Sequence, residues 1–395
     1  MNVRNDFPIL GKYPSLTYLD SACTSLKPRA VIAAQDEYYE EFGACAGRSA
    51  HSLARKTSGK IEECREGIAK FLGAKAGGLA FTKNATEGLN LVANSFDFSK
   101  RRQVITTILE HHSVLLPLMR LRDEGKIALE MLRPGGDGMV AIEEWELKID
   151  RNTALVLTNN ANNTTGIGHD ANAICKIAHE SGAAVCIDGA QGVPHRKTDF
   201  ARSGFDFLCF SGHKMLGPTG IGAIAMGEEW VGKMRPFLLG GGTVKSVSEA
   251  KMEMLPSTER FEAGIQNYSG IFGLAAACGY LNKIGMGKVE EHEKKLASLL
   301  AGALEGVGAK ILGNPRAQNH SALYSFNVAG AKPHDIALLL DRKDIAVRSG
   351  FFCAQPGLEA LGARQGAVRA SCYVYNSEQE VKRLGEALQE IGRLY

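Results

Sequence analysis

The chain has 395 residues, of which 45% are hydrophobic and 23% are charged, and its net charge is +3. The length predicts two domains, because it exceeds what one small core needs. So small a charge, without a run of lysine or arginine, argues against nucleic acid and against an anionic membrane surface as partners.

No membrane or targeting segment is expected. The longest nearly apolar run, at 269–281, is too short to span a bilayer. The first residues, MNVRNDFPIL, carry Asp6 early and lack the apolar region of a signal peptide. Nine cysteines, an odd number without a CxxC pair, predict reduced thiols. We therefore expect a cytoplasmic protein.

The first two thirds of the chain alternate short apolar runs with amphipathic stretches, which is typical of a parallel α/β sheet. Strands are expected at 78–82, 103–108, 153–158, 183–188 and 205–210, and helices at 86–96, 113–125 and 171–182. The last two strands are apolar throughout, as expected when both sheet faces are covered. Four cysteines lie in such strand or helix patterns and are expected in the core: Cys175, Cys186, Cys209 and Cys278.

The pattern changes after about residue 265. The remaining elements are expected to be one long helical stretch at 267–304, a strand at 321–330, a helix at 333–343, a strand at 367–376 and a terminal helix from Ser377. This predicts a small α+β domain formed by 1–14 and 266–395, beside a large α/β domain formed by 15–265.

Polar residues follow several expected strands directly. The first such group is Ser211, His213 and Lys214, the second is Asp188 and Gln191, and the third includes Asn163. Ligands of parallel α/β sheets gather at the carboxyl ends of the strands. A helix also begins just after 78–82, and the free N–H groups at a helix start hold phosphate well. These features predict a cofactor that carries a phosphate.

Lys214 and Asp188 fit pyridoxal phosphate. A deprotonated lysine forms a Schiff base with an aldehyde. An acid keeps the pyridine nitrogen protonated, so that the ring can act as an electron sink. Each residue alone also has a simpler interpretation, because Asp188 could cap a helix and Lys214 could be a solvated loop residue.

The stretch RSGFFCAQPG places Cys353 between Gly350 and the pair Pro356–Gly357. Glycine and proline punctuate turns, so Cys353 is expected on a loop. A thiol there is either a nucleophile or a small apolar residue under a turn.

The segments IDGAQGVPH and FDFLCFSGHKMLGPTGIG together resemble the signature of the class V aminotransferase family, fold type I of the pyridoxal-phosphate enzymes. The resemblance extends over nearly the whole chain, through DFPIL…YLDSACTSLKP, FTKNATEGLNLVANS, LEHHS and ERFEAG. VRSGFFCAQP and VRASCYVYNS resemble the group II cysteine desulfurases, which include selenocysteine lyase-like members. The resemblance implies a large domain with a mostly parallel central sheet and a smaller α+β C-terminal domain.

The resemblance also implies site roles. Lys214 would hold pyridoxal 5'-phosphate through a Schiff base, Asp188 would pair with the pyridinium nitrogen, and Gln191 would bond the phenolic oxygen. The phosphate would be held by Ala85, Thr86, Ser211 and His213. The substrate would be bound by Asn163, Arg348 and Arg369, with Arg48 and His51 at the rim of the pocket. His111 would stack on the ring and, with Lys214 and Cys353, would be catalytic.

The implied reaction converts L-cysteine to L-alanine. Lys214 would remove the Cα proton, and the Cys353 thiolate would take the substrate sulfur as a persulfide. The family implies a homodimer and a small sulfur-acceptor protein. Two alternatives stay open, a selenocysteine lyase or other C–S lyase, and a persulfide or iron–sulfur scaffold on Cys23, Cys45 and Cys353.

Three positions depart from the family pattern in ways that bear on the chemistry. Phe351 and Phe352 stand where group II enzymes usually carry two histidines. They predict a desolvated thiolate and the loss of a proton donor. Ile265 stands where a threonine usually reaches the other subunit's phosphate, and it cannot donate that hydrogen bond.

Cys23 and Cys45 stand where the family mostly has alanine or asparagine. They are either small residues that line the pocket or extra thiols that relay sulfur or bind a metal or a cluster.

Overall fold

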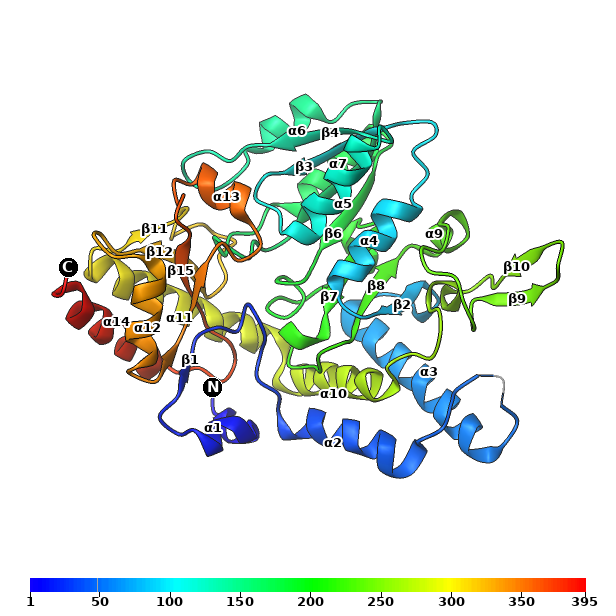
Figure 1. Ribbon diagram of the computed structural model, residues 1–395, viewed down its shortest axis with the longest axis horizontal. Helices are drawn as coiled ribbons and strands as arrows, with labels where there is room; N and C mark the ends of the chain where they lie inside the picture. Colours follow the sequence, from blue (N-terminus) through cyan, green and yellow to red (C-terminus); the bar gives the residue numbers. More distant parts are fainter. Residues whose placement is uncertain (48) are drawn as a thin grey trace.

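The computed structural model describes residues 1–47 and 49–395, and its largest feature is a seven-stranded sheet (Figure 1). The strand order is β2-β8-β7-β6-β5-β3-β4. The strands are β2 (Leu79–Thr82), β3 (Gln103–Thr107), β4 (Ala128–Leu132), β5 (Thr153–Asn159), β6 (Ala184–Asp188), β7 (Phe207–Ser211) and β8 (Gly222–Met226). β8 is antiparallel to both of its neighbours, and the other pairs are parallel. The predicted α/β fold with a mostly parallel sheet is confirmed.

Helices cover both faces of this sheet, because consecutive strand residues point to opposite sides. Leu155 and Leu157 pack with α4, α5 and α9, whereas Val156 packs with α3, α6, α7 and α10. These helices are α3 (Ser52–Leu72), α4 (Ala85–Ser95), α5 (His112–Asp123), α6 (Ile142–Lys148), α7 (Ala171–Glu180), α9 (Glu228–Lys233) and α10 (Tyr268–Ile284). Burial on both faces is why the central strands carry near-continuous apolar runs before the polar residues at their carboxyl ends.

A smaller antiparallel sheet of four strands lies beside the large one, in the order β11-β12-β15-β14 (Figure 1). Its strands are β11 (Lys310–Ile311), β12 (Leu323–Asn327), β14 (Arg348–Gly350) and β15 (Ala367–Ser371). The helices α11 (Met286–Gly306), α12 (Pro333–Asp341) and α14 (Glu378–Gly392) supply apolar residues to the same core. Ser377 caps α14, and its side chain accepts from the Glu380 N–H in a capping box, so the terminal helix begins where the sequence predicts.

Both ends of the chain contribute to this smaller part. β1 (Thr17–Tyr18) pairs in parallel with β13 (Ile345–Ala346), and Asp20 bridges to Ser371. By contrast, α10 packs against α3 and α2 (Arg29–Glu37) in the core of the larger part. A division at 265/266 with only 1–14 joined to the C-terminal part stays a prediction, and these contacts favour placing 17–20 with the smaller part and α10 with the larger.

Short elements complete the described chain. They are α1 (Pro8–Lys12), α8 (Phe200–Ser203), α13 (Gln355–Ala360), a projecting hairpin of β9 (Val244–Val247) and β10 (Met252–Met254), and the single turns Arg4–Asp6, Tyr38–Phe42, Ala76–Gly78, Gly212–Lys214 and Thr258–Phe261.

Two predicted elements differ from the structure. The helical stretch expected at 267–304 is two helices, because Gly285 takes a φ of 91° that ends α10 before α11 begins. The strand expected at 367–376 ends at Ser371, because Asn376 folds back and its Oδ1 accepts the Tyr373 N–H. The helices α2 and α3 and the strands β4 and β8 were not among the predicted elements.

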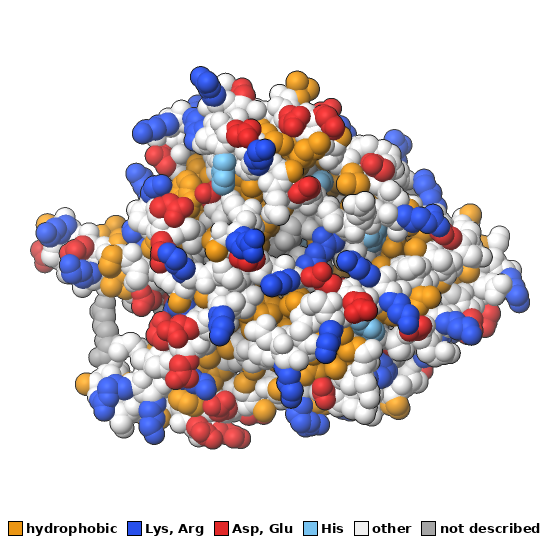
Figure 2. Space-filling view, turned by 180° about the vertical axis from the view of Figure 1, so that it is seen from behind, with side chains coloured by type: hydrophobic (Ala, Val, Ile, Leu, Met, Phe, Trp, Pro, Cys, Tyr) orange, Lys and Arg blue, Asp and Glu red, His pale blue; other side chains and the backbone are white. Residues whose placement is uncertain are grey.

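Charges of both signs are interspersed over the face seen in Figure 2, as the small net charge predicts. Within residues 1–47 and 49–395, none of the helices combines the length and hydropathy that a bilayer crossing requires.

A buried ion pair fastens α3 and the segment before Ile265 to strand β2. The Arg65 nitrogens Nη1 and Nη2 lie 2.6 and 3.0 Å from the two carboxylate oxygens of Glu262. Glu262 Oε1 also accepts the Phe81 N–H at 2.8 Å, and Arg65 Nη1 donates to the Leu79 carbonyl at 2.9 Å. Each side chain is only 6% exposed. Arg65 Nε also lies 3.3 Å from Glu62, which is largely exposed, so the loss of Glu262 would leave Arg65 only this solvent-screened partner.

We expect Glu262→Leu to destabilise the protein by about 3–5 kcal/mol, because Arg65 then stays buried and keeps only the largely exposed Glu62 as a carboxylate partner. For a chain of this length that corresponds to a fall of about 4–6 °C in the thermal midpoint, measured by circular dichroism. The double variant Arg65→Met/Glu262→Leu should lose less than the sum of the two single variants. The control is Glu228→Ala, which breaks the exposed pair with Lys75. If Glu262→Leu lowers the thermal midpoint no more than Glu228→Ala does, the prediction is contradicted.

Candidate active site

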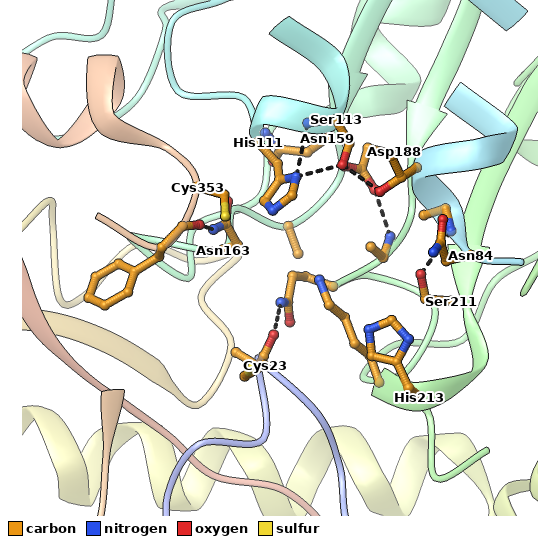
Figure 3. Close-up of a pocket in the computed structure, with 18 of the residues that line it drawn as sticks. Cys23, Asn84, His111, Ser113, Asn159, Asn163, Asp188, Ser211, His213 and Cys353 are labelled. Atoms are coloured by element: carbon orange, nitrogen blue, oxygen red, sulfur yellow. Dashed lines mark hydrogen bonds between the residues drawn. The ribbon is translucent and has the colours of Figure 1, made fainter. Parts of the chain in front are cut away.

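A cavity of about 200 Å³ lies at the carboxyl ends of β5, β6 and β7 and is closed on one side by the smaller part (Figure 3). Fourteen of the residues considered from the sequence line it: Cys23, Ala85, Thr86, His111, Asn163, Asp188, Gln191, Ser211, His213, Lys214, Arg348, Phe352, Cys353 and Arg369. Residues more than 300 positions apart therefore meet in one place, at the strand ends where ligands of parallel α/β sheets bind.

One wall of the cavity is the start of α4. Asn84 caps this helix, and its side chain accepts the Glu87 N–H at 3.0 Å. The Ala85 N–H donates to Ser211 Oγ at 2.8 Å, which ties the helix start to the end of β7. A Cβ at Gly222 would lie 2.8 Å from the Asn84 Cα, so the strand behind the helix start can approach this closely only as glycine. The free N–H groups and the positive end of the helix dipole suit a phosphate.

Two buried opposite charges lie at the ends of adjacent strands. Asp188 is the last residue of β6, and its Oδ1 accepts the Ala190 N–H at 3.0 Å. Lys214 ends the turn Gly212–Lys214 that follows β7. Burial raises the pKa of Asp188 and lowers the pKa of Lys214, and each effect is opposed by the other charge. Within the described chain, the Lys214 amine has no hydrogen bond or ion pair and remains free to react.

These residues fit pyridoxal phosphate. A buried carboxylate whose charged form is disfavoured gains most from a protonated ring nitrogen beside it. A buried lysine with a lowered pKa has the neutral amine that a Schiff base requires. Burial, helped by Lys214, lowers the pKa of His213 to about 4, so its imidazole would meet a phosphate in the neutral form. A neutral imidazole keeps one N–H donor, which joins the hydroxyl and backbone N–H donors at that end of the cavity.

The half-buried His111 and the fully buried residue before it form a second polar group. His111 caps α5, and its Nδ1 accepts the Ser113 N–H at 3.1 Å. Burial lowers the pKa of His111 to about 3, so the ring is neutral. Glu110 is fully buried and accepts from Thr107, Thr158 and Asn159 at 2.9 Å each. Burial raises the pKa of Glu110 to about 7.

Glu110 and Asn159 were not predicted as site residues. Asn159 ends β5 and lines the cavity, and among the described residues its buried Oδ1 has no hydrogen-bond partner. The sequence does carry a signal for Glu110, because this acid directly precedes His111 after an apolar strand. A buried ionisable group at such a position is a candidate for a functional residue.

Arg369 lies beneath the cavity on β15. Its Nη1 donates to the Asn163 carbonyl at 2.9 Å, its Nη2 lies 3.3 Å from Asp20 Oδ1, and its guanidinium stacks 4.8 Å from the centre of the Phe352 ring. Its Nε is buried without a partner within the described chain. Arg348 on β14 is more exposed and lies 3.5 Å from Asp20 Oδ2. Two guanidinium groups thus face one carboxylate, so this group of three side chains has a net positive charge that can bind an anionic group of a substrate.

Cys353 lies at the cavity mouth, in the turn between β14 and α13, as the sequence predicts. Phe352 and Cys353 both have left-handed backbones, with φ of 52° and 57°. The turn is held by two bonds, from Asn163 Nδ2 to the Phe352 carbonyl at 2.9 Å and from the His112 N–H to the Cys353 carbonyl at 2.7 Å. Figure 3 shows Cys353 beside Asn163 and His111.

The two phenylalanines before Cys353 do not cover its thiol. Phe352 is 7% exposed and packs in a small apolar cluster with Leu312, Leu358 and Ala367, and Phe351 packs against the same cluster. The side chain of Cys353 is exposed. The predicted desolvation of the thiolate by its aromatic neighbours is therefore wrong, because the rings turn under the loop.

Several predicted residues lie away from this cavity. His51 is exposed and caps α3, where its Nδ1 accepts the Ala54 N–H at 3.2 Å. Cys45 lines another cavity, of about 620 Å³, together with Ile265 and Tyr268. Arg48 lies outside the described residues. Across the described chain, no three His, Cys, Asp or Glu side chains are grouped to hold a metal, and Cys45 does not share a cavity with Cys23 and Cys353.

The raised pKa of Glu110 predicts a pH-dependent stability. A group that binds its proton more tightly when folded contributes stability below its ordinary pKa of 4.5, and this stability fades as the pH rises through about 7. The loss amounts to roughly 3 kcal/mol. The difference in thermal midpoint between Glu110→Gln and wild type should therefore shift by about 4 °C in favour of the variant when the pH is raised from 5 to 8.

The matched control is Glu146→Gln, which makes the same change at an exposed glutamate on α6. A constant difference between wild type and Glu110→Gln across this range would contradict the prediction.

Comparisons with known proteins agree with this geometry. The family model described as "Aminotransferase class-V" matches residues 17–384. A "Probable cysteine desulfurase" of Methanothermobacter thermautotrophicus is 37% identical over 395 residues, which cover 99% of this chain and 97% of that protein.

Two solved structures are closely similar. The apo structure of a cysteine desulfurase from Thermococcus onnurineus NA1 has a TM-score of 0.95 at 38% identity, covering 100% of this chain and 98% of that one. The S-sulfonic acid form of the cysteine desulfurase CsdA from Escherichia coli has a TM-score of 0.90 at 31% identity, covering 99% and 98%. The chain therefore belongs to the class V aminotransferase family of pyridoxal-phosphate enzymes.

Proposed function

We propose that this protein is a pyridoxal-phosphate-dependent cysteine desulfurase, which converts L-cysteine to L-alanine and receives the sulfur on Cys353. The observation that carries the proposal is the meeting of Lys214, Asp188, Arg369 and Cys353 in one cavity. Relatives that are 37% and 38% identical over nearly the whole chain bear this activity in their names. When bound, pyridoxal phosphate supplies an electron sink that makes the Cα proton and the C–S bond of an amino acid labile.

Lys214 is the proposed proton carrier. A general base must be unprotonated near the working pH and close to the proton that it takes. Burial disfavours the ammonium form of Lys214, and its free amine lies in the same cavity as the cofactor-binding residues. Nζ can therefore take a proton from the substrate's Cα and return it to carbon.

Arg369 is the proposed partner of the substrate carboxylate, with Arg348 and Asn163 beside it. A planar guanidinium matches a carboxylate with two parallel hydrogen bonds. The Arg369 side chain is held by Asn163, Asp20 and Phe352, so little conformational entropy is lost when an anion binds. The substrate's thiol would then lie on the side of the cavity where Cys353 sits.

Cys353 is the proposed sulfur acceptor. Its Sγ forms a bond to the substrate sulfur while the substrate's Cβ–S bond breaks, so Cys353 carries a persulfide and the carbon skeleton leaves as alanine. The thiolate is the reactive form. Its exposure at the cavity mouth supports a further transfer of the sulfur to an acceptor, for which a small protein is proposed.

The sulfur-transfer proposal predicts that Cys353→Ala loses both products. Purified holoenzyme should release alanine and sulfide in equal amounts from L-cysteine in the presence of a reductant, and the variant should make neither. Removal of the attacking thiol leaves the C–S bond intact, whatever the state of the cofactor. If pyruvate and sulfide appear without alanine, and to the same extent in the variant, the enzyme is a β-eliminating lyase and the proposal fails.

We also propose a homodimer. Large apolar side chains are exposed between residues 237 and 265, and such a patch is typical of a protein–protein contact. They are Phe237, Leu238, Leu239, Val247, Met252 and Ile265, of which Ile265 is 75% exposed. A second copy on this surface would cover them and bring new residues towards Cys45, which lines the same cavity as Ile265.

Sedimentation equilibrium should therefore give twice the mass of the chain, and Ile265→Lys should shift the protein towards a monomer because it buries a charge in the contact. Leu147→Lys is the matched control, since Leu147 is 74% exposed on α6, away from this patch. A wild-type protein with the mass of one chain at micromolar concentration would exclude the dimer.

A further inference from the structure

Two thiols line the same small cavity. Cys23 follows β1 near the start of the chain, and Cys353 lies in the turn after β14 near its end. Figure 3 shows them on different walls of the cavity. A negative charge on either sulfur acts on the Lys214 ammonium, whose pKa both would raise, so both lie within electrostatic reach of one reacting group.

Cys23 differs from the buried cysteines of the core. Burial raises the pKa of Cys64 and of Cys175 to about 12, which keeps these thiols unreactive. Cys23 is only half-buried, and its Sγ accepts a hydrogen bond from Arg348 Nη1 at 2.8 Å. A sulfur that faces a guanidinium and an open cavity is in the setting of a reactive thiol.

The strand and turn that carry Cys353 also contact Cys23. Arg348, which contacts the Cys23 sulfur, lies five residues before Cys353 on a continuous segment. That segment is anchored at the carbonyls of Phe352 and Cys353 and leaves the Cys353 side chain exposed. A persulfide on Cys353 can thus turn into the cavity, where Cys23 is held, or outwards to solvent.

We propose that Cys23 is a resolving thiol that releases the sulfur of the Cys353 persulfide as sulfide. This inference rests on the proposed desulfurase function. The Cys23 thiolate attacks the Sγ of Cys353, the Cys23–Cys353 disulfide forms, and the bond from Sγ to the outer sulfur breaks. The outer sulfur leaves with its proton and the electron pair as hydrosulfide. A dithiol reductant then opens the disulfide and restores both thiols.

Attack on the inner sulfur is favoured by the leaving group. Exchange at sulfur is faster when the departing anion is the conjugate base of the stronger acid. Attack on Sγ expels hydrosulfide, a weaker base than a cysteine thiolate, whereas attack on the outer sulfur expels the Cys353 thiolate. A simple relay that moves the persulfide to Cys23 would also carry the sulfur away from the cavity mouth and from an acceptor.

The reach of the two thiols can be tested without turnover. Holoenzyme treated with diamide, a thiol oxidant, should yield a peptide pair joined by Cys23 and Cys353 in non-reducing mass spectrometry. Cys23→Ala and Cys353→Ala should both lose this pair. Cys45→Ala, which removes an exposed thiol from the other cavity, should keep it. Absence of the pair in wild type would overturn the proposal, because the sulfurs then cannot meet.

The resolving step itself is tested with one equivalent of L-cysteine per chain and no reductant, followed by alkylation and mass spectrometry. Wild type should form one alanine, one sulfide and the Cys23–Cys353 disulfide. Cys23→Ala should lose the disulfide and keep the persulfide on Cys353. Alanine with a lasting Cys353 persulfide in wild type overturns the resolving role alone. No alanine in wild type overturns the proposed function and the inference with it.

Discussion

The structure depends most on two opposite charges that are buried at the ends of neighbouring strands. Asp188 and Lys214 lie at the carboxyl ends of β6 and β7, and burial works against the charged form of each. Their mutual attraction offsets part of this cost, and a cofactor with a cationic ring nitrogen and an aldehyde would satisfy both. The chemistry of the cavity depends on this pair, because Asp188 supplies a carboxylate that can bind a cation and Lys214 supplies an amine that can act as a nucleophile.

The walls around this pair come from distant parts of the chain, and a few polar contacts hold them together. Asn163 is central, because its side chain binds the Phe352 carbonyl while its own carbonyl accepts from Arg369. These contacts fix the segment after β5, which carries Asn163, to the strand β15 and to the Cys353 turn. Asp20 extends the same network to the N-terminal segment through Arg369 and Arg348. The guanidinium groups that would bind substrate are thus positioned by the contact between the two parts of the molecule.

The histidines of the cavity are kept neutral, and Glu110 shifts towards neutrality as the pH falls below about 7. Burial lowers the pKa of His111 and His213 and raises that of Glu110. In such a site the permanent positive charge is concentrated on Arg369 and Arg348, so an anionic substrate is directed to them rather than to an imidazolium. The cysteines also differ in their surroundings. Those of the sheet are buried in the core, whereas Cys23 and Cys353 face the cavity.

Much of this arrangement follows from the sequence alone. Apolar strands that alternate with amphipathic helices determine a parallel sheet covered on both faces, and polar residues after those strands must meet at its carboxyl edge. Lys214, Asp188 and Ser211 could be found in this way, because local order along the chain places them at strand ends. The break at Gly285 could not, since glycine adopts positive and negative φ about equally readily and the local sequence does not determine which of them it takes.

Other features were decided by tertiary structure. The sequence places Phe351 and Phe352 beside Cys353, but only the apolar cluster beneath the turn directs the rings away from the thiol. Likewise Cys23 and Cys45 look alike in the sequence, yet one lies against Arg348 in the cavity and the other lines a separate one. The role of Glu110 depends on three donors from β3 and β5. Local sequence determines which elements form, whereas side-chain direction and burial depend on neighbours that are distant in the chain.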